Sequence, residues 1–307
     1  PFRINEPASI GDNQSVNSLL NLTPESLNFN QNRTNFNNAE LVSLNAIFNP
    51  TEKLKIKTLI FFNWDETDFF RNSIDVTDVN GTNFTNNQKL ELRNKNRVAF
   101  GKLDFTYNIS KTKMLEATTK YNNGYFNDNS DLFFNGNSTI ENLQHQNTLF
   151  DQKINYTNKF KDKKVFLLTG RFIDEKTPQN YNINHFFYQD LFPSNTTANN
   201  VSQQSTNQMQ FAGLNIHLLD RKDNGHLLEL QLGNEFRKDK LQSTFSLLEN
   251  NIVLEKPSGY QNETNYQVNN LFVKGKYRLK MKDFGIVAKL YIHQLFNRLE
   301  NNNFGST

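Results

Sequence analysis

The segment GKLDFTYNISKTKMLEATTKYNNGYFND, residues 101–128, contains two runs of alternating apolar and polar residues separated by a short polar break. The apolar series is Leu103, Phe105 and Tyr107 before the break, and Leu115, Ala117, Thr119 and Tyr121 after it. Period-two alternation on both sides of a short turn predicts a β-hairpin with one apolar and one charged face. The question is whether the apolar face meets a protein core or a lipid.

The same pattern recurs in four more places, which predicts five hairpins and about ten strands. Their short turns are near Pro50, Lys111, Asp162, Asp223 and Lys282. Asn224-Gly225 in the fourth turn predicts a type I′ turn. The connections between hairpins read as long polar loops over residues 75–87, 122–142 and 182–207. Short turns therefore alternate with long loops, and no stretch has helical periodicity.

The composition excludes several classes of protein. Only 36% of residues are hydrophobic and 51 of the 307 are Asn, but 28 Phe and 10 Tyr are too many for a disordered chain. The net charge is only +3 with both signs dispersed, so we expect no nucleic-acid partner. There is no Cys, which excludes disulfides and thiolate metal sites. The sequence contains no run of 18 apolar residues, so no transmembrane helix is predicted.

Three features favour lipid over a protein core. Short and long connections alternate, as they do in transmembrane barrels. Aromatic residues collect beside the short turns, as an interfacial girdle would: Phe48, Tyr107, Tyr156 and Phe160. The opposite face carries successive charges, which a hydrated lumen accommodates. Polar alternation also continues past the apolar runs, as in Lys120 to Asn127 and Phe236 to Phe245, so the strands are expected to be longer than the 5–6 residues of soluble domains. The fold class predicted is therefore all-β, an antiparallel up-and-down transmembrane β-barrel wall.

Three segments carry a resemblance to a known family: LNAIFNPTEKLKIKTLIFFNWDETDFF, FGKLDFTYNISKTKMLEATTKYNNG and KINYTNKFKDKKVFLLTGRF. They resemble the barrel of TonB-dependent-receptor-like outer-membrane proteins, especially the Asn-rich "outer membrane protein β-barrel" group. The resemblance covers most of the chain from about Ala39 onward. It implies a barrel of about 22 strands around a plug, with a TonB box near the N-terminus. No plug, TonB box or C-terminal aromatic residue is recognised here, so we expect a piece of such a barrel.

The domain organisation predicted is a polar loop or linker over residues 1–38 and an outer-membrane β-barrel segment of five hairpins over residues 39–307. We expect an open, curved sheet, about half of a larger wall. Its edge strands are predicted near Val42 to Phe48 and Ile286 to Phe296. An open edge in hydrocarbon leaves backbone groups unsatisfied, so the isolated piece is not expected to insert stably.

The function that the resemblance implies is uptake of a bulky solute across the cell outer membrane. The expected partners are outer-membrane lipid, TonB through an N-terminal part outside this sequence, and an extracellular ligand or protein that binds the long loops. A second reading is a non-transporting barrel that serves as a structural or assembly component, or as a surface platform that binds proteins. A third is a soluble or secreted all-β adhesin.

The sequence predicts no enzyme, metal or cofactor, and it identifies no ligand-binding residue. The five histidines lack metal-ligand spacing: His145, His185, His217, His226 and His293. Asp75 to Asn83 and Asn127 to Asp131 carry oxygen ligands that calcium could use, although solvated Asn/Asp turns are the preferred interpretation. Trp64, Phe61-Phe62, Phe69-Phe70 and Phe186-Phe187-Tyr188 interrupt the alternation and suggest a second interfacial belt or an aromatic contact surface.

The alternation also assigns side chains to faces. The lipid-facing set is Leu103, Phe105, Leu115, Ala117, Leu214, Ile216, Leu230 and Leu290, and the inward set is Glu116, Lys153, Glu229 and Lys289. The short turns should all lie at one end of the strands. The loops around Asn80, Asn129, Asn195 and Asn251 should lie at the other end, which is expected to be extracellular.

Overall fold

The computed structural model describes residues 10, 14–15, 36–160, 163–185, 197–281 and 284–301, and these residues form an all-β structure. The strands are β1 (Phe36–Thr51), β2 (Leu54–Val79), β3 (Thr82–Asn108), β4 (Lys113–Phe134), β5 (Asn137–Phe160), β6 (Lys164–Ile183), β7 (Asn200–Arg221), β8 (Leu227–Glu249), β9 (Ile252–Glu255), β10 (Asn262–Lys280) and β11 (Gly285–Asn301). A short 3-10 turn, η3 (Ser258–Tyr260), precedes β10. Among the described residues, no helix is long and apolar enough to cross a membrane.

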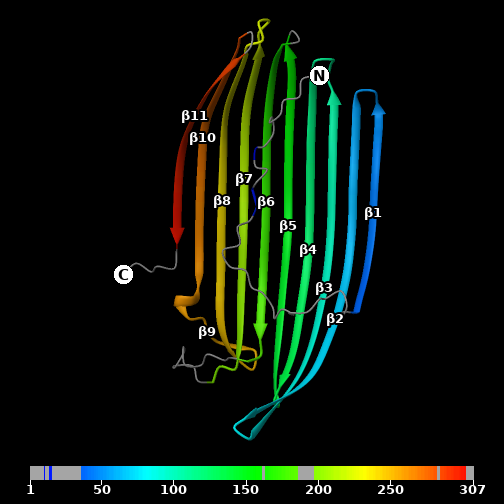
Figure 1. The fold of residues 1–307 in the computed structure, drawn as a ribbon, viewed down its shortest axis with the longest axis vertical. Coiled ribbons are helices and arrows are strands. Elements are labelled where there is room, and N and C mark those ends of the chain that lie inside the picture. Colours follow the sequence, from blue (N-terminus) through cyan, green and yellow to red (C-terminus); the bar gives the residue numbers. More distant parts are fainter. Residues whose placement is uncertain are drawn as a thin grey trace.

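All strands belong to one antiparallel up-and-down sheet in the order β1-β2-β3-β4-β5-β6-β7-β8-β10-β11, with β9 paired to the end of β8 (Figure 1). The prediction of about ten strands is confirmed, apart from the added four-residue β9. The sheet is open, because within the described residues β1 pairs only with β2, and β11 only with β10. The predicted edge strands are therefore correct.

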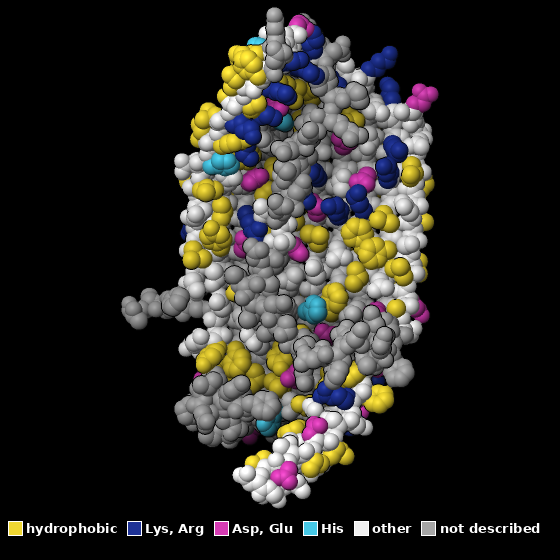
Figure 2. All heavy atoms as spheres, in the orientation of Figure 1, with side chains coloured by type: hydrophobic (Ala, Val, Ile, Leu, Met, Phe, Trp, Pro, Cys, Tyr) yellow, Lys and Arg dark blue, Asp and Glu magenta, His cyan; other side chains and the backbone are white. Residues whose placement is uncertain are grey.

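The sheet register is regular, so alternate residues lie on two distinct faces. We call the face that carries Lys120, Asp151, Arg171 and Arg237 the polar face; Ile10 lies against it. Figure 2 shows this face, with positive and negative side chains along the length of the sheet. The other face, which we call the apolar face, has no second sheet against it in the described structure. The side chains of Leu214, Leu230 and Leu290 on it are 53%, 43% and 60% exposed.

The apolar face carries an apolar band in the half of the sheet next to the short turns, interrupted by polar residues such as Gln152 on β5 and Asn234 on β8. Counted away from those turns, we place its end on each strand at a last apolar residue that is followed two positions later by a polar or charged one; Tyr125 on β4 and Phe296 on β11 lie beyond that end on the same face. These last apolar residues are Val42 on β1, Trp64 on β2, Ala99 on β3, Tyr121 on β4, Phe150 on β5, Phe172 on β6, Ala212 on β7, Phe236 on β8, Leu271 on β10 and Ile292 on β11. Beyond the band the same face carries ion pairs such as Lys95–Glu66 and Arg93–Asp68. The band is therefore bounded by polar surface.

The short turns all lie at one end of the strands, as predicted (Figure 1). The type I′ prediction at Asn224-Gly225 is wrong, because only Gly225 has a positive φ, of 83°. The Lys222 amide instead donates to the His226 carbonyl, and the Gly225 amide donates to the Lys222 carbonyl. One left-handed glycine that follows a β-turn produces this wider turn.

Two of the predicted long loops are wrong. Residues 75–87 are the ends of β2 and β3, joined by a two-residue turn in which Asn80 and Gly81 have φ of 55° and 85°. Residues 122–142 are likewise strand, joined at Asn135-Gly136 with φ of 47° and 93°. Positive φ at both central residues is the type I′ geometry that Asn-Gly favours. The sequence predicts loops here because both segments are rich in polar residues. Such residues hide the apolar–polar alternation by which a strand is recognised.

The strands are consequently far longer than those of soluble domains. The strands on the main path, β1–β8, β10 and β11, contain 16 to 27 residues, and the polar continuations past the apolar band are confirmed as strand. The third predicted loop, residues 182–207, is shorter than expected, because β6 continues to Ile183 and β7 begins at Asn200. The calls at Asp162, Phe186-Phe187-Tyr188, Asn195 and Lys282, and most of the 1–38 linker, fall outside the described residues.

Candidate functional site on the polar face

The most enclosed part of the molecule lies on the polar face of β5 to β8, where residues from near the N-terminus contact the sheet. Ile10 is 4% exposed and packs among Ile173, Met209 and Phe211, with Leu149 at the margin. These four residues come from β5, β6 and β7, which the register places side by side. The sheet thus provides an apolar pocket for a single side chain in an otherwise polar surface.

Gly213 on β7 gives this pocket its depth. A Cβ built on Gly213 would lie 2.6 Å from Cδ1 of Ile10 and 3.0 Å from the ring of Phe211. Both distances are shorter than real Cβ contacts, so any larger residue at position 213 competes with Ile10 for the same space. The pocket therefore depends on glycine for its volume rather than for its backbone conformation.

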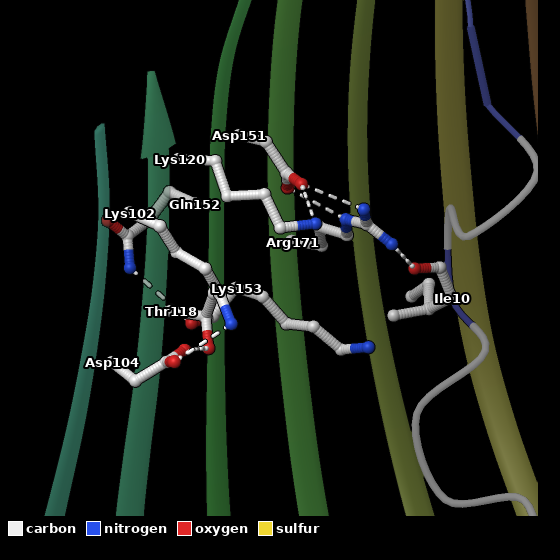
Figure 3. A network of polar contacts seen from close by, with 9 residues as sticks. All are labelled: Ile10, Lys102, Asp104, Thr118, Lys120, Asp151, Gln152, Lys153 and Arg171. Carbon is white, nitrogen blue, oxygen red and sulfur yellow. Dashed lines mark hydrogen bonds and ion pairs between the residues drawn. The ribbon is translucent and has the colours of Figure 1, made fainter. Parts of the chain in front are cut away.

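Arg171 on β6 binds the main chain of the same residue. Its Nη1 donates to the carbonyl oxygen of Ile10 at 2.9 Å (Figure 3). Its Nε and Nη2 donate to the two carboxylate oxygens of Asp151 at 2.8 and 2.9 Å, a bidentate pair with side chains 8% and 7% exposed. Lys120 lies 3.4 Å from the same carboxylate. Asp151 therefore fixes the guanidinium so that one edge remains for the carbonyl of Ile10.

Arg237 on β8 repeats this arrangement two strands away. Nε and Nη2 of Arg237 each donate to a carboxylate oxygen of Asp239 at 2.7 Å. Nη2 also donates to the carbonyl oxygen of Ser15 at 3.1 Å, and Nη1 donates to Oε1 of Gln14 at 2.5 Å. Two arginines, each oriented by an aspartate, thus hold two main-chain carbonyls of the same segment.

A second polar network adjoins the first on β3 and β4. Lys102 pairs with Asp104 at 2.8 Å, and the Thr118 hydroxyl donates to Oδ1 of Asp104 at 2.8 Å (Figure 3). Lys276 on β10 pairs in the same way with Glu229 on β8, at 3.2 Å. Charges of both signs therefore alternate across the whole polar face, and Glu229 lies on that face as predicted.

The other residues singled out in the sequence do not form a site. His145 stacks on Phe126 with ring centroids 4.4 Å apart, and His226 lies 2.8 Å from the Tyr277 hydroxyl. In the described part of the chain, no three His, Asp or Glu side chains are placed to hold a metal ion. Asp78, in the candidate calcium segment, accepts a hydrogen bond from the Gly81 amide and so caps a turn.

The aromatic residues that interrupt the alternation separate onto the two faces. Trp64 lies on the apolar face with the Arg97 guanidinium 4.5 Å above its ring. Phe61 lies on the polar face, stacked on Phe100 with centroids 5.2 Å apart. Among the described residues of this group, Phe62 and Trp64 lie within the band of the apolar face, and Phe70 lies on the same face beyond it.

Sequence reasoning placed Asp151 among the charges of the polar face but missed the site built around it. Ile10 and Ser15 lie in a segment predicted to be a linker, where no periodicity marks a contact. One signal was available: Arg171 is the one charged residue in the run Val165 to Ile173. The three comparisons, with protein-family models, with curated proteins and with solved structures, find no match for this chain.

Proposed function

We propose that this chain forms part of the wall of an outer-membrane β-barrel that resembles TonB-dependent receptors and takes up a bulky solute. The sheet presents a bounded apolar band on one face and paired charges on the other, which are the surfaces that hydrocarbon and a hydrated interior require. Its polar face would line the route of the solute. Coupling to TonB, as the resemblance implies, would use a part of the protein outside this sequence.

The observation that carries the proposal is the oblique course of the apolar band across the strands. The band ends at Val42 on β1, and the hydrogen-bonded row through Val42 crosses the sheet to Glu300 on β11. On β10 this row passes through Asn265 and the band ends at Leu271, so the boundary shifts by six residues, from 265 to 271, over eight strand-to-strand steps. At about 3.3 Å per residue and about 4.8 Å between strands, this shift is a tilt of about 25–30°.

Strands of transmembrane barrels tilt by about 35–45° from the barrel axis. An apolar layer perpendicular to that axis must then cross the strands obliquely, as this band does. The band extends over ten residue steps on β2, from Leu54 to Trp64, and over six on β4, from Leu115 to Tyr121. With the tilt included, these lengths correspond to a height of about 18–29 Å, against about 25 Å for outer-membrane barrels.

The open edges fit a wall that further strands complete. In hydrocarbon, each unsatisfied backbone group costs several kcal/mol, so β1 and β11 require partners there. Hydrogen exchange of the intact protein in lipid tests this requirement. We expect every amide of both edge strands within the band to be protected. Rapid exchange of alternate amides in lipid would contradict the barrel wall.

Trp64 provides a direct test of the lipid contact, because it is the single tryptophan of the chain. The intact protein would be reconstituted in liposomes that contain lipids brominated at defined acyl positions. We expect bromine near the headgroups to quench Trp64 most strongly, since Trp64 lies at the boundary of the band. The matched control, Trp64→Phe with Phe61→Trp, moves the indole to the polar face and should lose the quenching. No quenching in either protein would favour a soluble adhesin, and equal quenching in both would contradict the assignment of lipid to the apolar face alone.

One observation favours the alternative of a protein-binding surface platform. The hairpin of β2 and β3 extends beyond its neighbours (Figure 1) and exposes large apolar side chains. Those side chains are Phe70, Ile74, Val76 and Phe84, which are 63%, 71%, 62% and 53% exposed. Deleting residues 74–79 and 82–87 together shortens the hairpin and keeps its register and its Asn80-Gly81 turn. Loss of surface binding by a partner with uptake unchanged would assign this hairpin to the platform role.

A further inference from the structure

We propose that the polar face of β5 to β8 is a binding site for an extended oligopeptide, and that Ile10, Gln14 and Ser15 occupy it as a ligand tethered to the same chain. The inference rests on the proposed function, since it names the class of solute that the interior wall recognises. Its evidence is independent of the lipid contact, because it comes from the contacts of Ile10 and Ser15 with the sheet.

The polar groups of the site fit main-chain carbonyls better than anions. An unpaired arginine favours carboxylate or phosphate, because it supplies a full charge and a bidentate fork. Here the Nε and Nη2 groups of both arginines already bind a carboxylate. Arg171 pairs with Asp151, and Arg237 pairs with Asp239. The described contacts with the N-terminal segment go to neutral acceptors: Arg171 donates to the carbonyl of Ile10, and Arg237 donates to the carbonyl of Ser15 and the side-chain amide oxygen of Gln14. A ligand rich in neutral carbonyls is a peptide.

The apolar pocket adds a requirement for one side chain. Ile10 is enclosed by side chains that are themselves at most 2% exposed: Ile173, Met209 and Phe211. The space above Gly213 accepts Cδ1 of an isoleucine, and the side chains that form the cluster with Ile10 are apolar. A branched or extended apolar residue therefore fits at this position, whereas a charged residue would lose its hydration.

The two carbonyl contacts have a spacing that a peptide can bridge. Arg171 and Arg237 lie two strands and about two residues apart, which corresponds to about 12 Å. Ser15 lies five positions after Ile10, and five steps of extended chain reach at most about 18 Å. The site therefore specifies the backbone at both positions, one apolar side chain at position 10 and a hydrogen-bond acceptor at position 14.

Tethering explains how a weak ligand could fill the site. A segment on the same chain has an effective concentration in the millimolar range, so even modest affinity keeps it bound. A free peptide must compete with this segment. The native chain should therefore bind added peptide more weakly than a chain whose own segment has been disabled.

The experiment uses the full chain and a capped, dye-labelled peptide with the sequence of residues 8–17, ASIGDNQSVN. In the receiving protein, Ile10→Asp disables the tethered ligand. We expect the peptide to bind this variant at least tenfold more tightly than it binds the native chain, as measured by fluorescence anisotropy. The same peptide with Asp in place of Ile should not bind detectably.

Two further variants locate the binding on the proposed surface. Adding Gly213→Leu to Ile10→Asp fills the pocket and should abolish binding, and adding Arg237→Gln should weaken binding about tenfold without touching the pocket. Lys240→Gln, on the apolar face, is the matched control and should leave binding unchanged. Circular dichroism confirms that each variant is folded. If the Gly213→Leu variant fails to fold, the peptide affinity of the Arg237→Gln variant alone tests whether binding occurs on this surface.

Absence of binding to the Ile10→Asp variant up to about 1 mM peptide would overturn the inference. Equal binding to all variants would overturn it too, since the contact would then lie elsewhere. The lipid test at Trp64 reports separately on the proposed function. Peptide binding without lipid quenching would mean that the oligopeptide site is real but that the sheet is not part of a membrane wall. Quenching without peptide binding would mean that the sheet is a membrane wall that recognises a different solute.

Discussion

β6, in the middle of the sheet, and β11, at its edge, both carry apolar residues on their two faces but differ in burial. On the polar face of β6, Val165, Leu167, Thr169 and Ile173 are at most 5% exposed. On β11, every residue from 285 to 299 is exposed, including Tyr291 and Ile292 on opposite faces, at 57% and 56%. Alternation therefore determines which face a residue occupies, and the neighbouring elements determine whether that face is buried.

The cause of the difference is visible on the polar face. β6 has a hydrogen-bonded neighbour on each side, and its polar face packs against Ile10. β11 has one neighbour, and no described segment covers either of its faces. Interactions of the same chemical type should consequently be worth much more in the middle of the sheet than at its edge.

The largest contrast is expected for two ion pairs. Asp151→Ala would leave Arg171 buried without its carboxylate, and breaking a buried pair costs about 3–5 kcal/mol. Glu300→Ala breaks the exposed pair with Arg298 on β11, which should cost no more than about 1 kcal/mol. Denaturant unfolding in one detergent measures both free energies. Similar costs for the two variants would contradict the difference between the middle and the edge.

The next contrast compares the two faces at adjacent positions of β8. Leu230→Arg places a charge within the apolar band and should cost about 2–4 kcal/mol in lipid. Gln231→Arg places the same charge on the polar face and should cost less than about 1 kcal/mol. The comparison is made by unfolding in liposomes. An equal cost for both substitutions would mean that the apolar face does not meet hydrocarbon.

A third contrast applies one substitution to a turn and to the middle of a strand. Gly136→Ala puts a Cβ at a residue with φ of 93° and should destabilise by about 1–2 kcal/mol. Gly101→Ala on β3 meets nothing within 4 Å and should stabilise by about 0.5–1 kcal/mol, because alanine loses less backbone entropy. Thermal unfolding reports the sign of each change. Destabilisation by Gly101→Ala would reveal a close approach at that position.

The sequence predicted the features that depend on local pattern. Period-two alternation correctly predicted antiparallel strands, the common end of the short turns and the faces of residues such as Leu230 and Glu229. The open sheet and its edge strands, which were predicted on other grounds, are also confirmed. It failed at the far ends of β2 to β5, where polar side chains hide the strand pattern. The Asn80-Gly81 and Asn135-Gly136 turns are in fact the strongest short-range hairpin signal that the chain contains.

The candidate site was not predictable from pattern, because it combines residues distant in sequence. The hydrogen bond between Arg171 and Ile10 joins positions 161 residues apart, and the contact of Arg237 with Gln14 spans 223. No period links a residue in an irregular segment to a sheet. Only an arginine within an apolar run and a glycine opposite it, Arg171 and Gly213, indicated that the polar face holds something there.

The smallest contrast concerns pH and two histidine stacks. His145 stacks on Phe126 beyond the apolar band, and burial lowers its pKa below 6.5, although Asp128 opposes the shift. The unfolded chain therefore takes up a proton more readily than the folded chain as the pH falls through 6.5. Stability contributed by neutral His145 is complete above that pH and is lost below it.

The variant His145→Phe keeps a ring on Phe126 and cannot titrate, so its stability should fall less than that of the native chain between pH 7.5 and pH 5. Burial raises the pKa of Asp128 above 3.8, which acts in the opposite direction and mainly at lower pH. The matched control is His293→Phe on β11, an exposed ring stacked on Phe272 with centroids 5.6 Å apart. Melting temperatures at the two pH values measure each difference. If both variants reduce the pH dependence equally, burial in the sheet is not its cause, and the middle and the edge are alike in this property.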